Sequence, residues 1–260
     1  EFNKWMRFGL TAYIENDLEK YTYTPDTLLY HQTESNTRVG AILSKELGQK
    51  FTYRFLGEID LIGYKMGDFN LETQVGSSFR LLKDTISIRA NGFMRNSEPS
   101  FFIQNYLSNH FRWSNNFDKT FRTHIGGTFA IPTRSFSLDV NVENITNQIY
   151  FDSLALPSQF DGNIQIVSAQ LKQDFRLGKF TLENNVVYQL SSNQVVIPLP
   201  MLTLYHNLYF HDKWFKVLSA QFGANVRYHT AYYAPAYMPA TGQFYSQNEM
   251  KIGNYPVVNV

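Results

Sequence analysis

Polar and apolar residues alternate through residues 201–233, and this alternation limits the folds open to the chain. Successive side chains of a β-strand point to opposite faces, so a period of two predicts strands with one polar and one apolar face. We expect two long strands joined by a turn at Asp212-Lys213, with His206 as the one polar residue on the first apolar face. No charged residue is expected on the apolar faces, which contain Leu202, Leu204, Leu208, Phe210, Ala220, Phe222, Ala224, Val226 and Tyr228.

Similar alternation continues through most of the remaining sequence and predicts about thirteen strands in all. Most of them have about ten residues or more, which is the length that a tilted strand needs to cross a bilayer. Strands of soluble proteins average only about five or six residues. Besides the hairpin above, the predicted strands are residues 5–14, 38–47, 51–65, 69–82, 85–95, 101–113, 121–131, 136–144, 167–175, 180–190 and 257–260.

The predicted connections are alternately short and long. Short turns are expected at Gly48-Gln49, Lys83-Asp84 and Leu177-Gly178-Lys179, and longer loops at residues 15–37 and 234–256. Such alternation is typical of barrels that span a membrane. It does not hold throughout, because the first two short turns are out of phase with the later ones. We therefore expect that one strand boundary between Ser97 and Ser135 is misplaced.

Alternation alone does not distinguish a lipid-facing sheet from a soluble sandwich or barrel whose apolar face is its core. Three features favour lipid: the strand length, aromatic residues at strand ends and turns, and a polar face that mixes Arg, Asn, Gln, Ser, Glu and Tyr. Charged residues are 17% of the chain, below the roughly 25% of ordinary soluble domains. No run approaches the ~20 apolar residues of a membrane-spanning helix.

We therefore predict an all-β fold, a transmembrane, antiparallel, up-and-down β-barrel. Residues 1–260 are expected to form part of one barrel domain that is truncated at both ends. Strand-like sequence already begins near Glu1, and Val257-Val258-Asn259-Val260 resembles the start of a further strand. The complete barrel should then have roughly 14 to 18 strands, and the upper end of that range leaves an aqueous passage.

The sequence predicts neither catalysis nor a metal site nor a cofactor. His206 and His211 are five residues apart, so a strand places them on opposite faces. Carboxylate pairs such as Asp174 with Glu183 share their face with cations, and a channel lining of mixed charge accounts for them. The chain has no cysteine, no hydrolase, zinc-protease or nucleotide-binding motif, and a net charge of +1, which gives no reason to expect nucleic acid.

Several stretches resemble known families of barrel proteins. Val196-Ile197-Pro198-Leu199-Pro200 followed by Leu204-Tyr205-His206-Asn207-Leu208-Tyr209, and later Tyr232-Tyr233-Ala234-Pro235, resemble the putative porin family of Bacteroidota outer membranes. This resemblance implies a longer polypeptide located in the outer membrane of a Gram-negative bacterium. Asn144-Ile145-Thr146-Asn147-Gln148-Ile149-Tyr150 also resembles an element near the end of TonB-dependent transporter barrels.

The predicted function is that of a porin-like, multi-pass outer-membrane barrel that allows passive diffusion of small hydrophilic solutes. Its expected partners are membrane lipid and these solutes. The inward charges either contact the solutes or only stabilise the wall. The candidate lumen-lining residues are Arg54, Glu58, Asp60, Arg80, Arg89, Lys172, Asp174, Arg176, Glu183, Arg227 and His229.

Two alternatives remain open from the sequence. The first is a plugged or non-conducting barrel that is a subunit of a larger secretion or nutrient-uptake complex, bound to other outer-membrane proteins or lipoproteins. Residues 234–256 would then form the contact or a constriction. The second is the barrel of a TonB-dependent transporter, which would need an energising partner in the inner membrane.

Overall fold

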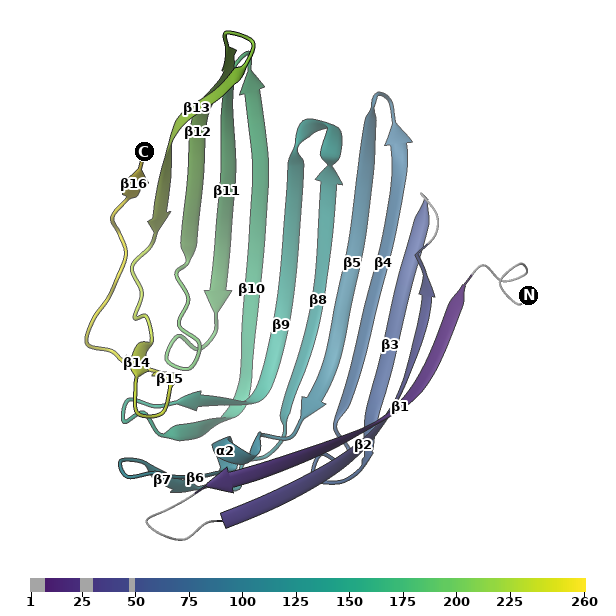
Figure 1. The fold of residues 1–260 in the computed structure, drawn as a ribbon, viewed down its shortest axis with the longest axis vertical. Coiled ribbons are helices and arrows are strands. Elements are labelled where there is room, and N and C mark those ends of the chain that lie inside the picture. The colour runs from purple at the N-terminus through teal and green to yellow at the C-terminus, as the bar shows by residue number, and fades with distance from the viewer. Residues whose placement is uncertain (1–7, 24–29, 47–49) are drawn as a thin grey trace.

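The chain folds into one large antiparallel sheet. A computed structural model describes residues 8–23, 30–46 and 50–260. Strands make up 71% of the described residues and helices 3%, and the sheet that they form has 12 strands (Figure 1). In their order across the sheet these are β1 (Gly9–Tyr23), β2 (Tyr30–Lys45), β3 (Phe51–Ile62), β4 (Phe69–Leu81), β5 (Asp84–Ser97), β8 (Thr120–Ile131), β9 (Phe136–Phe151), β10 (Pro157–Leu177), β11 (Phe180–Ser191), β12 (Leu202–Trp214), β13 (Leu218–His229) and β16 (Val257–Asn259).

This arrangement confirms the predicted all-β, antiparallel, up-and-down fold. The order of these strands in the sheet is the same as their order along the chain. The sheet is not closed, so β1 and β16 form its two edges. The architecture is therefore that of an incomplete barrel.

Smaller elements lie between the long strands. α2 (Phe101–Gln104), β6 (Asn105–Leu107) and β7 (Arg112–Ser114) connect β5 to β8, and η1 (Pro132–Arg134) connects β8 to β9. β14 (Ala236–Met238) and β15 (Gln243–Tyr245) precede β16 and pair with each other, as do β6 and β7. No helix in the described ranges is long and apolar enough to cross a membrane.

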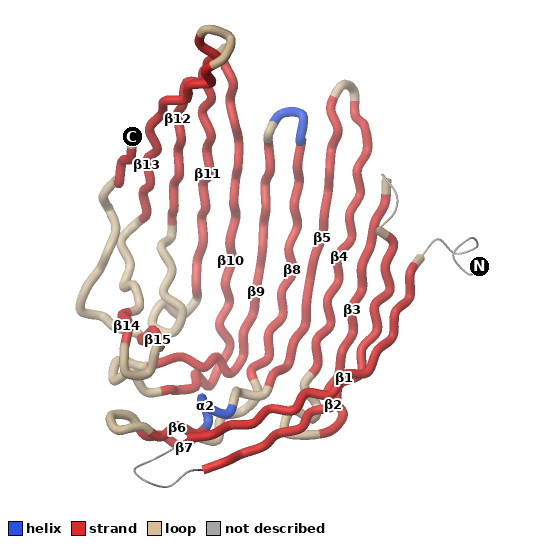
Figure 2. The backbone as a smooth tube through the Cα atoms, in the orientation of Figure 1, coloured by secondary structure: helices blue, strands red, loops and turns tan. Residues whose placement is uncertain are grey.

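The two ends of the sheet differ in their connections. β4–β5, β8–β9, β10–β11 and β12–β13 are joined at one end by short turns, and we call this the turn end (Figure 2). The opposite end, here the loop end, carries α2, β6, β7, β14 and β15 (Figure 1). The short turns share one end because residues 101–113 form α2 and the β6–β7 hairpin instead of the spanning strand that we predicted. This segment accounts for the misplaced strand boundary that was expected between Ser97 and Ser135.

Several other sequence predictions need correction. The polar stretch 15–37 is mostly strand, because β1 continues to Tyr23 and β2 begins at Tyr30. β9 and β10 are longer than predicted and include most of residues 145–166. These segments were misread because their outer faces are less apolar than those of the central strands. The turn predicted at Gly48-Gln49 lies outside the described residues.

The turn between β12 and β13 also lies further along the chain than predicted. Phe215 and Lys216 adopt φ of 52° and 66°, and Val217 completes the turn, whereas Asp212 and Lys213 are still in β12. Asp212 therefore lies in register with outward residues, next to the turn, where Lys179 Nζ donates a hydrogen bond of 2.6 Å to its carboxylate. The prediction that no charge lies on this apolar face is wrong at its turn end.

Successive hairpins are staggered. β4 continues four residues beyond Ser77, the partner of the first residue of β3. Likewise, β10 continues four residues beyond Gln173, which pairs with the first residue of β9. β12 continues four residues beyond Phe210, which pairs with the first residue of β11. Such a constant stagger is what tilts strands relative to the axis of a barrel.

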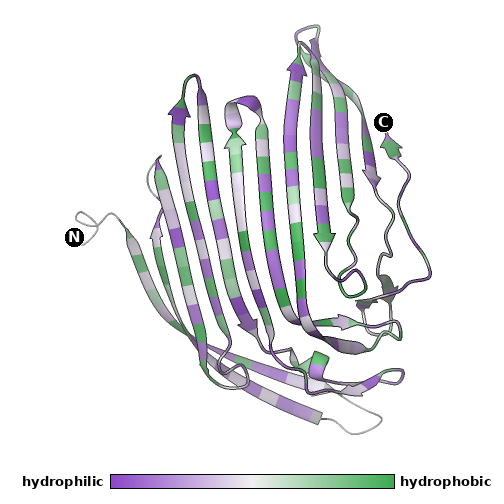
Figure 3. Ribbon diagram, turned by 180° about the vertical axis from the view of Figure 1, so that it is seen from behind, coloured by the Kyte–Doolittle hydropathy of each residue, from purple (hydrophilic) through white to green (hydrophobic). Residues whose placement is uncertain are grey.

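The sheet has two faces of opposite character. Figure 3 shows hydrophilic and hydrophobic residues alternating along the strands. Large apolar side chains on one face are exposed, including Leu10 at 68%, Ile14 at 73% and Ile125 at 69%. The opposite face carries the polar side chains, and Tyr21 on this side of β1 stacks on Phe101 of α2 with ring centroids 4.5 Å apart. We call the polar face inner and the apolar face outer.

Candidate functional site

The inner face of β3–β5, β8 and β9 carries a network of arginines and glutamates. Arg95 Nη2 lies 3.2 Å from Glu72 Oε1, and Arg54 lies 4.0 Å from the same carboxylate. On the next strands, Arg122 donates to Glu143 through Nε at 2.7 Å and also through Nη2. All of these side chains are partly exposed, so each pair contributes about 1 kcal/mol or less to stability.

Tyr13, on β1, reaches across β2 to bind Glu58 on β3. The Tyr13 hydroxyl donates a hydrogen bond of 2.5 Å to Glu58 Oε1, and Asn70 Nδ2 donates one of 3.0 Å to Glu58 Oε2. Gly40 pairs with Tyr13 and makes this crossing possible, because a Cβ at Gly40 would lie 2.4 Å from the Tyr13 ring. Glu58 is thus held against the wall.

Asp60 forms the most buried ion pair of the described residues. Its side chain is 3% exposed and accepts hydrogen bonds from Arg38 Nε at 3.2 Å and Nη2 at 3.0 Å. A carboxylate that is removed from water in this way needs such a partner. Asp60 lies near the loop end of β3, and its role as a lining residue stays a prediction.

Further charged groups gather at the loop end. Lys65 Nζ donates to Glu19 Oε1 at 2.8 Å, and Lys119 Nζ donates to Asp68 Oδ1 at 2.7 Å and lies 3.6 Å from Glu98. Burial raises the pKa of Glu34, and the facing Glu19 adds to this effect. Burial also raises the pKa of Glu98, which keeps its neutral form accessible at higher pH.

The strands β10–β13 carry six of the predicted residues, whereas Arg80 lies on β4 and Arg89 on β5. Asp174 lies directly opposite Glu183, and Glu183 accepts hydrogen bonds from Asn207 Nδ2 at 3.0 Å and the Tyr209 hydroxyl at 3.2 Å. The guanidinium of Arg227 lies 5.7 Å from the centroid of the Tyr205 ring. These contacts hold charges of both signs along one wall.

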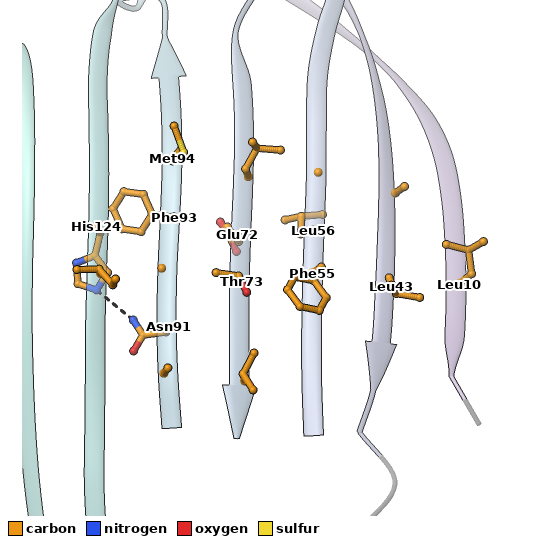
Figure 4. A pocket seen from close by; sticks show the side chains of 17 residues that line it. Leu10, Leu43, Phe55, Leu56, Glu72, Thr73, Asn91, Phe93, Met94 and His124 are labelled. Atoms are coloured by element: carbon orange, nitrogen blue, oxygen red, sulfur yellow. Dashed lines mark hydrogen bonds between the residues drawn. The ribbon is translucent and has the colours of Figure 1, made fainter. Parts of the chain in front are cut away.

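A shallow cavity of about 740 Å³ lies along β1–β5 and β8, and Figure 4 shows the side chains around it. Leu10, Leu43 and Phe55 give it a largely apolar lining, and Asn91 and His124 are joined by a hydrogen bond of 3.0 Å. In the described part of the chain no three His, Cys, Asp or Glu side chains are arranged to hold a metal ion. The cavity therefore offers an apolar surface without an evident reactive group.

Comparison with known proteins identifies the family. A family model described as a putative porin matches residues 1–260, which is the whole chain. The chain belongs to this putative porin family. No curated protein matched the sequence significantly. Membership gives this porin-family chain an outer-membrane, porin-like role in general terms.

The predicted lining residues of this porin-family chain share one face. The strand registers place all of them on the inner side, as the alternation required. Arg54 and Arg89 border one cavity of about 240 Å³, with Gln74 and Gly76 between their strands. The other charges are distributed over several strands. Their contact with a solute stays a prediction.

The sequence reading missed other inner-face residues, chiefly Arg95, Arg122 and Glu143. Their parity was the available signal, because Arg95 is an even number of residues from Arg89 and Asn91 on the same strand. Which carboxylate would face which arginine depends on the pairing of strands far apart in the sequence. Composition and spacing do not determine that pairing.

Proposed function

We propose that this chain is the wall of an outer-membrane channel through which small hydrophilic solutes diffuse passively. The observation that carries the proposal is the opposite character of the two faces along the same strands. In a bilayer, acyl chains would cover exposed outer residues such as Leu10 and Ile125, and the inner polar groups would line water. Membership of a putative porin family supports the same role.

The inner face has chemistry suited to a hydrated passage. Its charges are of both signs and are mostly tied to neighbours, as in Arg95 with Glu72 and Tyr13 with Glu58. Side chains held in this way remain in water-accessible positions, and neighbouring groups already satisfy part of their hydrogen-bonding capacity. Weak interaction with solute favours rapid passage, because a solute must leave as readily as it enters.

Planar-bilayer recording tests the proposal directly. The folded, purified protein should produce stepwise, ohmic currents, and vesicles that contain it should swell in small sugars faster than in larger ones. Empty vesicles and vesicles with heat-denatured protein serve as controls. Silence from a preparation whose β-sheet content is verified by circular dichroism would exclude passive diffusion.

The loop end favours a second candidate, a barrel that is closed by its own segments. Residues 101–113 lie across this end, where Trp113 contacts Phe151 with ring centroids 6.0 Å apart and Tyr21 stacks on Phe101. Replacing residues 101–113 with a short Gly-Ser linker distinguishes the two functions. A closed subunit should conduct only after this replacement, and a porin-like channel should conduct before it.

A further inference from the structure

Two arginines lie side by side on the inner face without an acidic residue between them. Arg95 on β5 and Arg122 on β8 are directly opposite each other in the register of the two strands. Like charges at directly opposed positions destabilise an antiparallel pair. An arrangement with this cost points to a use for two adjacent guanidinium groups.

Each of these arginines is oriented by its own acceptors. Arg95 donates through Nε to Asn70 at 3.2 Å and through Nη2 to Glu72 at 3.2 Å. Arg122 donates through Nε and Nη2 to Glu143. Both guanidinium groups also lie near the face of Phe93, at 5.6 Å and 6.0 Å from its centroid, within the range of a cation–π interaction.

Phe93 is itself fixed by a neighbour. It stacks on His124 with ring centroids 5.1 Å apart and an interplanar angle of 7°, and His124 is hydrogen-bonded to Asn91. The two arginines therefore have supported positions before any ligand arrives. Such support lowers the entropy that the arginine side chains lose when a ligand binds.

The arginines retain capacity to bind. Among the described residues, no hydrogen bond involves Nη1 of either Arg95 or Arg122. Their side chains are 44% and 42% exposed, whereas Glu143 is 18% exposed. Arg54, 38% exposed, shares Glu72 with Arg95, so the three arginines contact two carboxylates directly, Glu72 and Glu143, and a third, Glu58, is linked to Glu72 through Asn70.

We propose that Arg95 and Arg122, with Arg54 beside them, bind an oxyanion, namely a carboxylate or phosphate group of a small hydrophilic solute. The planar guanidinium presents paired donors whose geometry matches such oxygens. The inference rests on the proposed function only in that solutes reach this face from the lumen. On β10–β11, by contrast, the two directly opposed charged residues are acidic, Asp174 and Glu183.

Calorimetric titration of the detergent-solubilised, full chain with inorganic phosphate, and separately with acetate, tests the site. The unaltered protein should bind at least one of the two saturably. Arg122→Gln should weaken that binding about tenfold or more, because a hydrogen bond between charged groups is lost. Arg122→Lys keeps the positive charge but not the paired donors of the guanidinium, and this variant should bind with intermediate affinity.

Arg176→Gln provides the matched control, because Arg176 is an inner-face cation on β10, away from the three arginines. It should leave binding unchanged. Arg95→Gln repeats the test if Arg122→Gln does not fold, as judged by circular dichroism. The inference is overturned if neither anion binds the unaltered protein, or if Arg176→Gln weakens binding as much as Arg122→Gln does.

Conductance measured on the same preparation separates this inference from the proposed function. Saturable binding that depends on Arg122, in a protein that does not conduct, supports the oxyanion site and contradicts the passive channel. Conductance without binding of either anion supports the passive channel and contradicts the oxyanion site. The two ideas can therefore fail independently.

Discussion

The wall of the sheet and its loop end are stabilised in different ways. In the wall, outer apolar residues such as Ile125 are exposed, and inner ion pairs such as Arg95 with Glu72 are partly exposed. The loop end, together with the adjoining bend of β9 and β10, contains the side chains that are buried against other protein atoms. These include Phe101, Ile145, Phe151, Ala155, Ile164 and Val196, with the polar residues Glu34, Asn36, Asp60, Asp68 and Gln104.

The difference shows that this sheet does not depend on a core of its own. Its strands are joined by backbone hydrogen bonds, and under the proposed function lipid covers its outer face. The loop end resembles the interior of a soluble protein, in which buried polar groups need partners. A substitution should therefore cost more at the loop end than a similar one in the wall.

The largest effect is expected at Asp60. Asp60→Asn removes the charge that compensates Arg38 in a site where the carboxylate is 3% exposed, and should lower the free energy of unfolding by about 3 kcal/mol. Glu72→Gln is the control in the wall, where the ion pairs are partly exposed, and should cost about 1 kcal/mol or less. Urea-induced unfolding in lipid vesicles measures both values. Equal costs would remove the contrast between the two regions.

A smaller effect is expected at Gly40, which marks a tight contact within the wall. A Cβ in Gly40→Ala would displace the Tyr13 ring and break its hydrogen bond to Glu58, at a cost of about 1 kcal/mol. Gly127→Ala is the control, because a Cβ there would meet only Arg89 O at 3.8 Å. In a Tyr13→Ala background the cost of Gly40→Ala should disappear. If it persists, Tyr13 is not the reason for this glycine.

The smallest effect concerns the pH dependence of the loop end. Because burial raises the pKa of Glu34 and Glu98, packing there is most favourable in acid and is weakened as the pH rises through these raised values. Lys65 lowers the pKa of Glu19, so the Glu19 contribution is lost only on strong acidification. Amide hydrogen exchange of residues 101–113, corrected for its intrinsic rate, should be faster at pH 8 than at pH 5.

Glu34→Gln sharpens this prediction, because it removes one of the two groups that must lose a proton while buried. The difference in exchange between the two pH values should become smaller in this variant. Exchange in β10 and β11, which lie away from Glu34, gives the internal control. An unchanged pH dependence in Glu34→Gln would show that Glu34 is not responsible for the weakening.

The sequence was sufficient to predict the faces of the sheet but not the contacts across it. Alternation assigned Arg54, Lys172 and Arg227 to one face because side-chain direction depends only on position within a strand. The pairing of Tyr13 with Glu58, or of Lys119 with Asp68, joins residues 45 and 51 positions apart. Such contacts depend on strand register.

The loop end was the least predictable region. Its extended segments are polar, so the stretch 15–37 has the composition of a loop although β1 and β2 occupy most of it. Residues 101–113 alternate well enough to suggest a strand, yet they form a short hairpin and α2, which contacts Tyr21. Tertiary contacts, which a local pattern does not report, decide both structures.

A cysteine scan of β13 tests the central claim most directly, because the natural chain contains no cysteine. Single cysteines would replace the residues 219–226 in turn, and a charged, membrane-impermeant thiol reagent would be applied to the protein in lipid vesicles. Labelling should alternate: Ser219, Gln221, Gly223 and Asn225 should react, and Ala220, Phe222, Ala224 and Val226 should be protected. Uniform labelling of both sets, or the reverse pattern, would contradict a sheet with lipid outside and water within.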